Sequence, residues 1–427
     1  MRAMKDSGVE WIGEIPEEWN LIQTKRRFFN RKRVVGDAVN EYERLALTMR
    51  GVIKRSKEDS EGLQPEKFEG YQILEKNSLV FKLIDLENVN TSRVGLSPYT
   101  GLVSPAYIVL SNKLEDNRFY YYWFMFMYYN EVFNHLGGDG VRSALNAKDV
   151  LSIPIPDISA DNQKRIANYL DIKCSKIDSI IDKQQEVIEK LKDYKQSFIT
   201  DIITRGIKPH VKMKDSGIKW VDKIPVDWEN RKVLSILSMR VVDGPHESPE
   251  LYNDGIPYIS ASAIENGKIN FDKKRGYISE EYCDICDQRY KPQRNDILVI
   301  KLGGSTGQVA IVDTDERFNI WVPLAAVRCN EMANPYFVYY AFQSHYFIRQ
   351  MELSWTFGTQ QTLGVKTIEG LRIMLPPIDE QNEIVDFLKS KCDKLDEYIA
   401  EKQHLVDLMT SYKKSLIYEV VTGKKEV

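Results

Sequence analysis

Two stretches of the chain carry apolar residues at alternating three- and four-residue spacing, the pattern of a helix that buries one stripe. The first stretch, residues 161–204, has no Pro or Gly, starts at Asp161 as a candidate N-cap, and precedes Gly206 and Pro209. Its stripe is Cys174, Ile177, Ile181, Gln184, Ile188, Leu191, Lys195, Phe198 and Ile202. Adding 218 to each number gives a matching stripe from Cys392 to Val420. The pattern predicts two long helices.

Helices of this length need a partner along the whole apolar stripe, because they far exceed the usual helix length. Each predicted helix is the natural partner of the other, since both bury the same stripe. Two copies of one unit that bury the same surface against each other do so about a two-fold axis. We therefore expect the two helices to pack as an antiparallel coiled coil.

The duplication extends beyond the helices. The segment MKDSGVEWIGEIPEEW at residues 4–19 matches MKDSGIKWVDKIPVDW at residues 213–228 at nine of sixteen positions without a gap. FYYYWF at 119–124 aligns with FVYYAF at 337–342 under the 218-residue shift. The stretches between these segments match only in places. The chain is thus predicted to contain two copies of one scaffold that present two different surfaces.

The two variable stretches have an α/β pattern. Strand-like runs at 102–110, 295–303 and 307–314 alternate with turns and short helical segments. The aromatic run at 119–129 is too short to span a bilayer, and we expect it to form a helix buried against a sheet. The expected organisation is an α/β domain at 1–155, a helix within 156–210, an α/β domain at 211–375 and a helix within 376–427.

Composition narrows the class of protein. The first twenty residues lack an apolar leader, so we expect a cytoplasmic protein with no membrane partner. Five cysteines give no disulfide framework, and Cys283 and Cys286 lack the second ligand pair of a zinc site. We expect these two on a helical turn and no metal site.

The net charge of −3 hides a basic stretch. Residues 20–57 contain eleven Lys or Arg against three acids, a local charge of +8. A run of this kind is often only a solvated face. Its density here favours a polyanionic partner.

No catalytic motif is found. The phosphate-binding pattern G-x-x-x-x-G-K-[ST] is absent, and no Gly-rich loop for S-adenosylmethionine follows a first strand. NPYF at 334–337 lacks the second Pro of the N-P-P-Y motif of amino-methyltransferases, and a helix start explains it. Asp171 and Lys173, which superficially resemble part of a nuclease site, lie inside the first long helix. We therefore predict no catalytic residue in this chain.

Several segments together resemble one family. SGVEWIGEIPEEW, the IPIP and DNQKRI segment before the first helix, LPPIDEQNEIVDFL before the second, and DGPHESP with GIPYIS are similar to specificity subunits of type I restriction–modification systems. The resemblance covers essentially the whole chain in the order that the family shows. One departure is Asn162, which replaces the usual Glu.

The resemblance implies a non-catalytic DNA-recognition subunit. Each target-recognition domain would read one half of an asymmetric bipartite site in double-stranded DNA, and the helical rod would set the spacer. The chain would dock two modification subunits, which form an adenine methyltransferase, and restriction subunits would complete an ATP-dependent endonuclease. S-adenosylmethionine, ATP and Mg would belong to the partner subunits, with no cofactor in this chain.

Residue type and loop position then suggest contacts. Two Gly-bearing loops, 135–145 and 355–364, carry Arg, Ser or Gln, and Arg reads guanine while Gln reads adenine. An ordinary turn before a helix is the alternative for both. The expected DNA contacts are Arg50, Lys54, Arg55, Arg93 and Arg142 in the first domain, and His246, Lys301, Thr306, Gln360 and Gln361 in the second. The expected contacts with modification subunits are Tyr194, Phe198, Tyr412 and Leu416.

Three other interpretations of the sequence stay open. A solitary methyltransferase or nuclease could use these domains, although the missing motifs argue against it. The specificity chain of a related system that combines restriction with methylation fits the same residues. A scaffold whose two domains bind proteins rather than DNA is the third, and the basic stretch argues against it.

Overall fold

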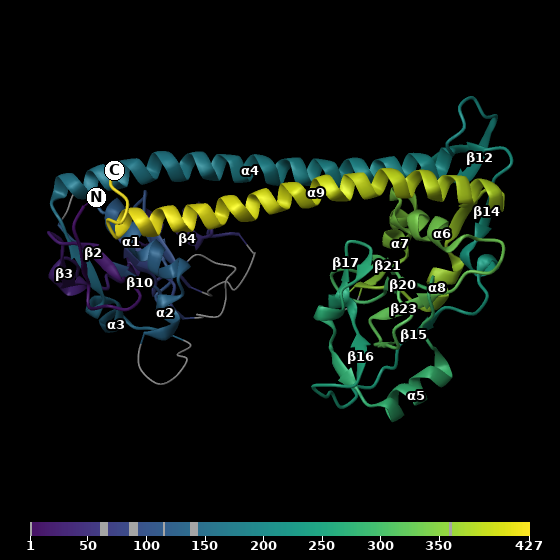
Figure 1. The fold of residues 1–427 in the computed structure, drawn as a ribbon, viewed down its shortest axis with the longest axis horizontal. Helices are drawn as coiled ribbons and strands as arrows, with labels where there is room; N and C mark the ends of the chain where they lie inside the picture. Colours follow the sequence, from purple (N-terminus) through teal and green to yellow (C-terminus); the bar gives the residue numbers. More distant parts are fainter. Residues whose placement is uncertain (1, 60–66, 85–92, 114–115, 137–143, 358–360) are drawn as a thin grey trace. The chain divides into compact units, whose positions relative to one another are not determined.

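The computed structural model describes residues 2–59, 67–84, 93–113, 116–136, 144–357 and 361–427 (Figure 1). Its contacts divide the chain into two compact units. Unit 1 is Met1–Gln185 with His404–Val427, and unit 2 is Glu186–Gln403. Each unit thus contains one α/β body and part of both long helices, α4 (Ala160–Arg205) and α9 (Ile378–Val421).

Unit 1 is built from short strands and a few helices before α4. In chain order they are β1 (Met4–Asp6), β2 (Glu14–Pro16), β3 (Asn20–Gln23), η1 (Thr24–Arg26), η2 (Gly36–Glu41), β4 (Arg44–Thr48), β5 (Gly51–Arg55), β6 (Gln72–Leu74), β7 (Leu79–Phe81), β8 (Val94–Leu96), β9 (Gly101–Val103), β10 (Ile108–Leu110), α1 (Arg118–Tyr129), α2 (Val132–His135), α3 (Ala147–Ser152) and β11 (Pro154–Asp157). A sheet of order β5-β4-β9-β6 and one of order β10-β7-β8 form the body.

Unit 2 has the same kinds of element between the two helices. They are β12 (Met213–Ile218), β13 (Val221–Pro225), β14 (Glu229–Lys232), η3 (Val233–Ile236), β15 (Val242–Asp243), β16 (Ile256–Ile259), η4 (Ala261–Ala263), β17 (Ile264–Glu265), β18 (Lys268–Ile269), η5 (Phe271–Lys273), β19 (Gly276–Ile278), α5 (Glu280–Arg289), β20 (Ile297–Ile300), β21 (Val309–Ile311), β22 (Asn319–Ile320), β23 (Leu324–Val327), α6 (Pro335–Gln343), α7 (His345–Ser354), β24 (Thr356–Phe357), β25 (Gln361–Thr362), α8 (Val365–Gly370) and β26 (Arg372–Leu375). The main sheet has the order β15-β23-β20-β21.

The aromatic run forms α1 and is buried, as the sequence predicts. Trp123 and Phe124 are fully buried, and Phe124 meets Phe81 of β7 edge to face at 5.0 Å between ring centroids. The strand expected over 102–110 is instead two strands, β9 and β10. A turn separates them, in which the Tyr107 N–H donates to the Ser104 carbonyl at 3.1 Å. Pro105 inside that turn has no N–H to offer a ladder, which explains the break.

The two long helices run antiparallel inside unit 1 (Figure 1). Cys174 and Ile177 of α4 share one buried cluster with Leu416 and Val420 of α9. Beside this seam the Lys413 ammonium lies 2.7 Å from the Asp178 carboxylate.

The same pairing occurs inside unit 2. Ile199 of α4 clusters with Leu388 of α9, and the Phe198 and Phe387 ring centroids are 5.9 Å apart. Lys195 lies 2.6 Å from Asp396. This ion pair is the counterpart of Asp178–Lys413 under the 218-residue shift, so the internal repeat is visible in the side-chain contacts of both units. A single continuous coiled coil along the helices stays a prediction.

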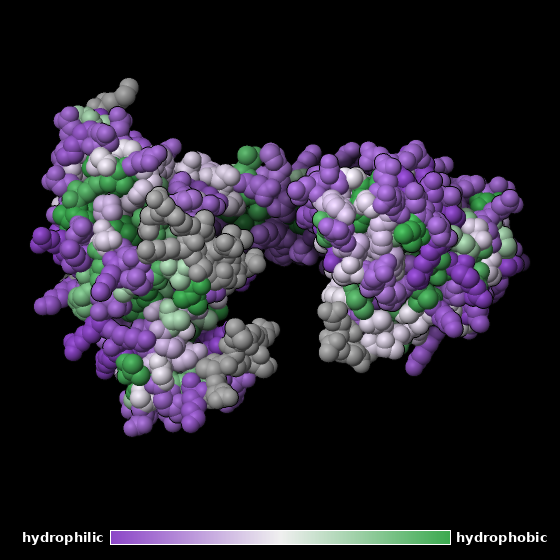
Figure 2. Space-filling view, turned by 90° about the horizontal axis from the view of Figure 1, so that it is seen from below, coloured by the Kyte–Doolittle hydropathy of each residue, from purple (hydrophilic) through white to green (hydrophobic). Residues whose placement is uncertain are grey.

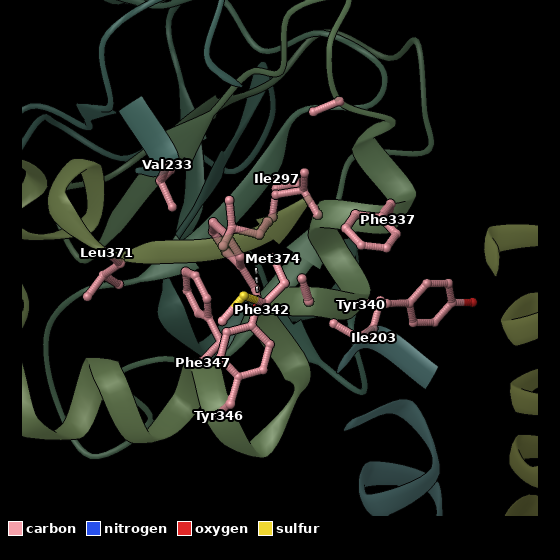
Figure 3. Packing of buried hydrophobic residues seen from close by; sticks show 14 of the residues in the cluster. Ile203, Val233, Ile297, Phe337, Tyr340, Phe342, Tyr346, Phe347, Leu371 and Met374 are labelled. Carbon is pink, nitrogen blue, oxygen red and sulfur yellow. Dashed lines mark hydrogen bonds between the residues drawn. The ribbon is translucent and has the colours of Figure 1, made fainter. Parts of the chain in front are cut away.

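The core of unit 2 packs aromatic residues from α6 and α7 against the sheet (Figure 3). The Phe342 and Phe347 rings stack at 4.1 Å between centroids. The Met374 N–H donates to the Tyr346 hydroxyl at 3.3 Å, which ties β26 to α7. Helix α6 begins at Pro335 with Asn334 as its N-cap, so the expected helix start at NPYF is confirmed.

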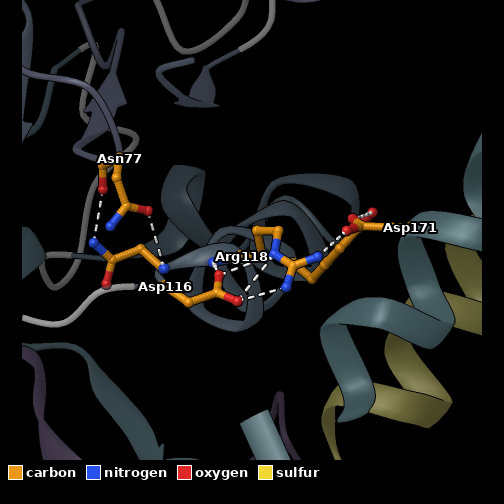
Figure 4. A network of polar contacts seen from close by, with 6 residues as sticks. Asn77, Asp116, Arg118 and Asp171 are labelled. Atoms are coloured by element: carbon orange, nitrogen blue, oxygen red, sulfur yellow. Dashed lines mark hydrogen bonds and ion pairs between the residues drawn. The ribbon is translucent and has the colours of Figure 1, made fainter. Parts of the chain in front are cut away.

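A polar network fixes the start of α1 against α4 within unit 1 (Figure 4). Arg118 donates to both oxygens of Asp116, at 3.0 and 2.6 Å, and to Asp171 of α4 at 2.5 Å. Tyr122 also donates to Asp171 at 2.7 Å. Asp171 thus has a structural role in holding the two helices together.

The opening segment of unit 1 forms the hairpin β1–β2 and packs on the end of α9. Trp19, which follows the hairpin, is 2% exposed. Gly423 adopts φ +73°, and a Cβ there would lie 2.5 Å from Pro16. The Lys424 ammonium donates to the Ile12 carbonyl at 3.3 Å. Among the helices that the structure describes, none is long and apolar enough to cross a membrane.

Candidate functional site

The loop after β15 in unit 2 is held rigidly by backbone contacts. The Gly244 N–H donates to the Leu324 carbonyl at 3.2 Å, and a Cβ on Gly244 would lie 2.3 Å from the Ile320 carbonyl oxygen. At the other end of the loop, the Trp321 indole N–H donates to the Glu247 carbonyl at 3.1 Å. Only glycine allows this close approach. The loop therefore presents its central residue, His246, from a fixed backbone.

Three cationic or titratable side chains converge on Asp243 at the start of this loop. The Lys301 ammonium lies 2.9 Å from the carboxylate and the His246 Nε2 lies 3.2 Å from it, while Arg289 donates to its other oxygen. Burial acts to raise the pKa of Asp243, but the Lys301 hydrogen bond and the charges of Lys301, Arg289 and His246 outweigh it and lower the pKa. Asp243 is therefore a charged anchor for three donors.

The same part of unit 2 brings two further predicted residues together. The Thr306 hydroxyl donates to the Gly303 carbonyl at 2.7 Å, and the Gly303 N–H donates to the Gln361 carbonyl at 3.2 Å. The Leu363 N–H donates to the Lys301 carbonyl at 2.8 Å. His246, Lys301, Thr306 and Gln361 thus belong to one connected site. Gln360 lies outside the described residues.

Burial corrects two of these assignments. Lys301 is 7% exposed and Thr306 is 8% exposed. The Lys301 ammonium is paired with Asp243, and the Thr306 hydroxyl donates to the Gly303 carbonyl within its own loop. Both side chains support the site from inside, so neither is available for direct contact with a DNA surface. His246 remains well exposed at the side chain, at 69%.

In unit 1 the predicted contacts gather on the hairpin β4–β5. Arg50 lies exposed in its turn. Lys54 pairs with Glu43 at 2.5 Å, a hydrogen bond that raises the pKa of Lys54. Arg55 donates to Asp59 at 2.6 Å. The hairpin thus carries three cations, two of which are held by carboxylates.

Arg93 does not belong to this surface. It is 4% exposed, donates to the Asn134 side chain at 2.8 Å and lies over the Tyr128 ring at 5.8 Å. Its expected contact with DNA is therefore not supported, because the guanidinium is enclosed by α1 and α2. Arg142 falls outside the described residues.

The basic stretch 20–57 is partly neutralised. Four of its cations hold carboxylates: Arg27–Asp157, Arg33–Glu75, Lys54–Glu43 and Arg55–Asp59. Within the described ranges, exposed cations of this stretch without such a contact are Lys25, Arg26, Arg31, Lys32 and Arg50. The surface that remains for a polyanion is smaller than the count of charges suggests.

The four predicted partner contacts divide into two kinds. Tyr194 is 57% exposed and Tyr412 is 50% exposed, and they are equivalent under the internal repeat. Leu416 is 1% exposed in the core of unit 1, and Phe198 packs against the core of unit 2. Leu416 and Phe198 therefore fill the helix seam, and their assignment as docking residues is corrected.

Unit 2 presents a mostly hydrophilic face, with hydrophobic residues lying singly among polar ones (Figure 2). Cys283 and Cys286 lie on α5 with both side chains buried, so the helical turn predicted for them is confirmed. Among the residues that the structure describes, no three His, Cys, Asp or Glu side chains are grouped so that they could hold a metal ion.

Sequence reasoning missed Asp243 and Arg289. Asp243 stands in VDGPHESP, where the Gly-Pro turn was the only signal. Arg289 is the last residue of α5, and no motif in the adjacent sequence indicates a functional role for it. The contact between them joins residues 46 positions apart, and only the fold brings them together.

Comparison with known proteins follows the same division of the chain. The sequence profile of the family described as "Type I restriction modification DNA specificity domain" matches residues 40–192 and 225–404. These two ranges together make up more than half of the chain.

Individual relatives cover most or part of the chain. The type I restriction enzyme MjaX specificity subunit of Methanocaldococcus jannaschii is 23% identical over 97% of this chain and 96% of its own length. The EcoBI specificity subunit of Escherichia coli is 26% identical over 60% of this chain and 58% of its own length. A chain from a solved type I R-M system shares the fold, with a TM-score of 0.61, 12% identity, and coverage of 95% of this chain and 98% of that one.

Proposed function

Because this chain belongs to the family of type I restriction modification DNA specificity domains, we propose that it selects the DNA sequence on which a restriction–modification complex acts. Unit 1 and unit 2 each read one half of a bipartite site in double-stranded DNA. The observation that carries the proposal is the duplication: two units repeat one scaffold, yet present different polar loops. Two different readers imply an asymmetric site.

The chain supplies recognition and not chemistry. Modification subunits bring the methyl donor and transfer the methyl group to adenine, and restriction subunits bring ATP-dependent cleavage. The exposed pair Tyr194 and Tyr412 supports the binding of two modification subunits, because the repeat makes the two positions equivalent. A surface present twice binds two copies of the same partner.

The helices set the unread spacer between the two half-sites. Helix α4 has 46 residues, and an α-helix rises about 1.5 Å per residue. Adding or removing whole turns of both helices should therefore change the number of unread base pairs, while the bases read in each half-site stay the same.

The decisive experiment uses the assembled complex. The chain is expressed with its modification subunit, and methylated adenines are mapped on genomic DNA by single-molecule sequencing. The expected result is one split, asymmetric motif, whereas the chain alone should transfer no methyl group. An assembled complex that methylates no split motif would contradict the proposal.

Salt dependence gives an independent check on the DNA-binding step. Binding driven by phosphate contacts falls by roughly three to five orders of magnitude between low and moderate salt when six to ten phosphates are contacted. Affinity that is insensitive to salt would instead favour a scaffold that binds proteins.

A further inference from the structure

We propose that Arg289 reads a guanine in the half-site bound by unit 2, and that Asp243 is the positioning residue that orients it. The inference rests on the proposed function, and it goes further by naming a specificity-determining side chain and the base it recognises. His246 presents a second polar group at the same edge.

The first step is that Asp243 is fixed. Its backbone pairs with Ala325 in the β15–β23 ladder, and its side chain is only 10% exposed. Lys301, itself buried, holds one carboxylate oxygen at 2.9 Å. The Gly244 contact with the Ile320 carbonyl prevents the loop from shifting. The second carboxylate oxygen is therefore presented at a defined place.

The second step is that Arg289 keeps donors for a ligand. Its Nη2 donates to Asp243 Oδ1, while 52% of the side chain is exposed. Arg has five N–H donors in a planar fork, so those not directed at Asp243 remain available. Guanine presents two adjacent acceptors, O6 and N7, in the major groove, and Arg matches them with two parallel hydrogen bonds.

The third step is that this arrangement suits a base better than a phosphate. An exposed Lys or Arg can meet a phosphate from many directions, and such contacts carry no sequence information. Holding the guanidinium in one orientation reduces the conformational freedom lost on binding and makes the contact directional. The Asp243–Arg289 pair provides this orientation before DNA arrives.

The charged side chains around Arg289 and the 243–247 loop are themselves held by protein contacts. The carboxylates of α5 nearest to Arg289 in sequence, Asp284 and Asp287, both accept from Arg317. Arg275 stacks on the Trp321 ring with 3.4 Å between the guanidinium carbon and the ring centroid. Trp321 in turn holds the 243–247 loop through Glu247. A cation thus lies beside the loop, and the two α5 carboxylates nearest to Arg289 in sequence are paired with Arg317.

The test maps methylated sites for complexes that carry the wild-type chain, Arg289→Gln or Asp243→Asn. Arg294→Gln is the matched control, because Arg294 is also an exposed arginine of unit 2 that holds a carboxylate, that of Asp315 at 2.7 Å. Arg289→Gln should lower discrimination at one guanine of one half-site by roughly ten- to hundredfold. The other half-site and the Arg294→Gln motif should not change.

Asp243→Asn separates positioning from stability. A purely structural loss would lower methylation at every site without altering base preference. A positioning role instead relaxes the same guanine that Arg289→Gln relaxes. Thermal unfolding of each variant complex shows how much protein is folded, and Arg289→Gln keeps the proposal testable if Asp243→Asn does not fold.

A modified base tests the hydrogen bond to guanine N7 directly. Binding is measured with duplexes in which 7-deazaguanine, which lacks the N7 acceptor, replaces the guanine relaxed in the methylation map. The wild-type complex should bind the probe at least several-fold more weakly than the normal duplex, and the Arg289→Gln complex should bind both equally. An unchanged motif in Arg289→Gln, or a uniform loss at all sites, would overturn the inference. A wild-type complex without any split motif would instead overturn the proposed function itself.

Discussion

The replacement Leu416→Ala should destabilise unit 1 strongly. Leu416 is 1% exposed and shares its cluster with Ile417, Val420 and Cys174. The change removes three buried carbon groups, which costs about 2.4 kcal/mol of transfer free energy at ~0.8 kcal/mol for each. The cavity left behind raises the expected total to about 3 to 5 kcal/mol. For a unit of this size, that corresponds to a fall in Tm of roughly 6 to 20 °C.

The matched control is Leu408→Ala on the same helix. Leu408 is 51% exposed, so the identical chemical change should alter the free energy of unfolding by less than about 0.5 kcal/mol. Thermal unfolding measures both variants. Hydrogen exchange then locates the effect, because peptides from α1 in unit 1 should lose protection while peptides from unit 2 serve as the internal reference.

The assignment of Leu416 to the core would be refuted by one combination of results. The two variants would melt at the same temperature, and only Leu416→Ala would fail to assemble with the modification subunit. That outcome would return Leu416 to the docking surface. Destabilisation of Leu416→Ala alone agrees with the burial of Leu416 in the core of unit 1.

Three further outcomes are expected. Gly244→Ala should abolish folding of the loop after β15, because its Cβ would meet the Ile320 carbonyl at 2.3 Å. Gly304→Ala is the control and should be tolerated, since open space surrounds that position. Thermal unfolding compares the stability of the two variants. The Arg118 hydrogen bond lowers the pKa of Asp116 below its ordinary 3.8, so the stability that the charged carboxylate supplies is present above about pH 4 and lost as the pH falls. In Asp116→Asn, the free energy of unfolding measured with urea should therefore depend less on pH across that range. A double-mutant cycle on Asp178 and Lys413 should give a coupling of at most about 1 kcal/mol that falls with added salt, and a larger, salt-independent value would contradict a solvent-screened pair.

The long helices were predictable because their signal is periodic and local. The stripe from Cys174 to Ile202 faces a partner in each unit, and the polar positions Lys195 and Lys413 meet the carboxylates Asp396 and Asp178. Symmetry of the repeat was enough to predict antiparallel pairing. The strand at 102–110 was less well predicted, because a Pro-containing turn inside an apolar run interrupts the ladder without changing the pattern of hydrophobicity.

The site residues were harder to predict because their role depends on burial. Arg93 and Lys301 carry the charge that DNA attracts, yet both are enclosed by the fold, where Arg93 donates to Asn134 and Lys301 pairs with Asp243. Arg289 has no local mark, since its function depends on Asp243, which lies 46 residues earlier in the chain. Charge and loop position are visible in a sequence, whereas enclosure is decided by which strands pair.

The packing of the opening hairpin on the end of α9 affects how the protein is made on the ribosome. Unit 2 is continuous in sequence, so all of its residues are translated before residues 404–427. Unit 1 needs residues 404–427 to cover Trp19 and the seam of α4, and these are translated only after the whole of unit 2. Unit 2 can therefore close before unit 1, which keeps apolar surface open until residues 404–427 have left the ribosome. Nascent chains stopped before residue 404 should be preferred clients for chaperones, and unit 1 is the part those chaperones would hold.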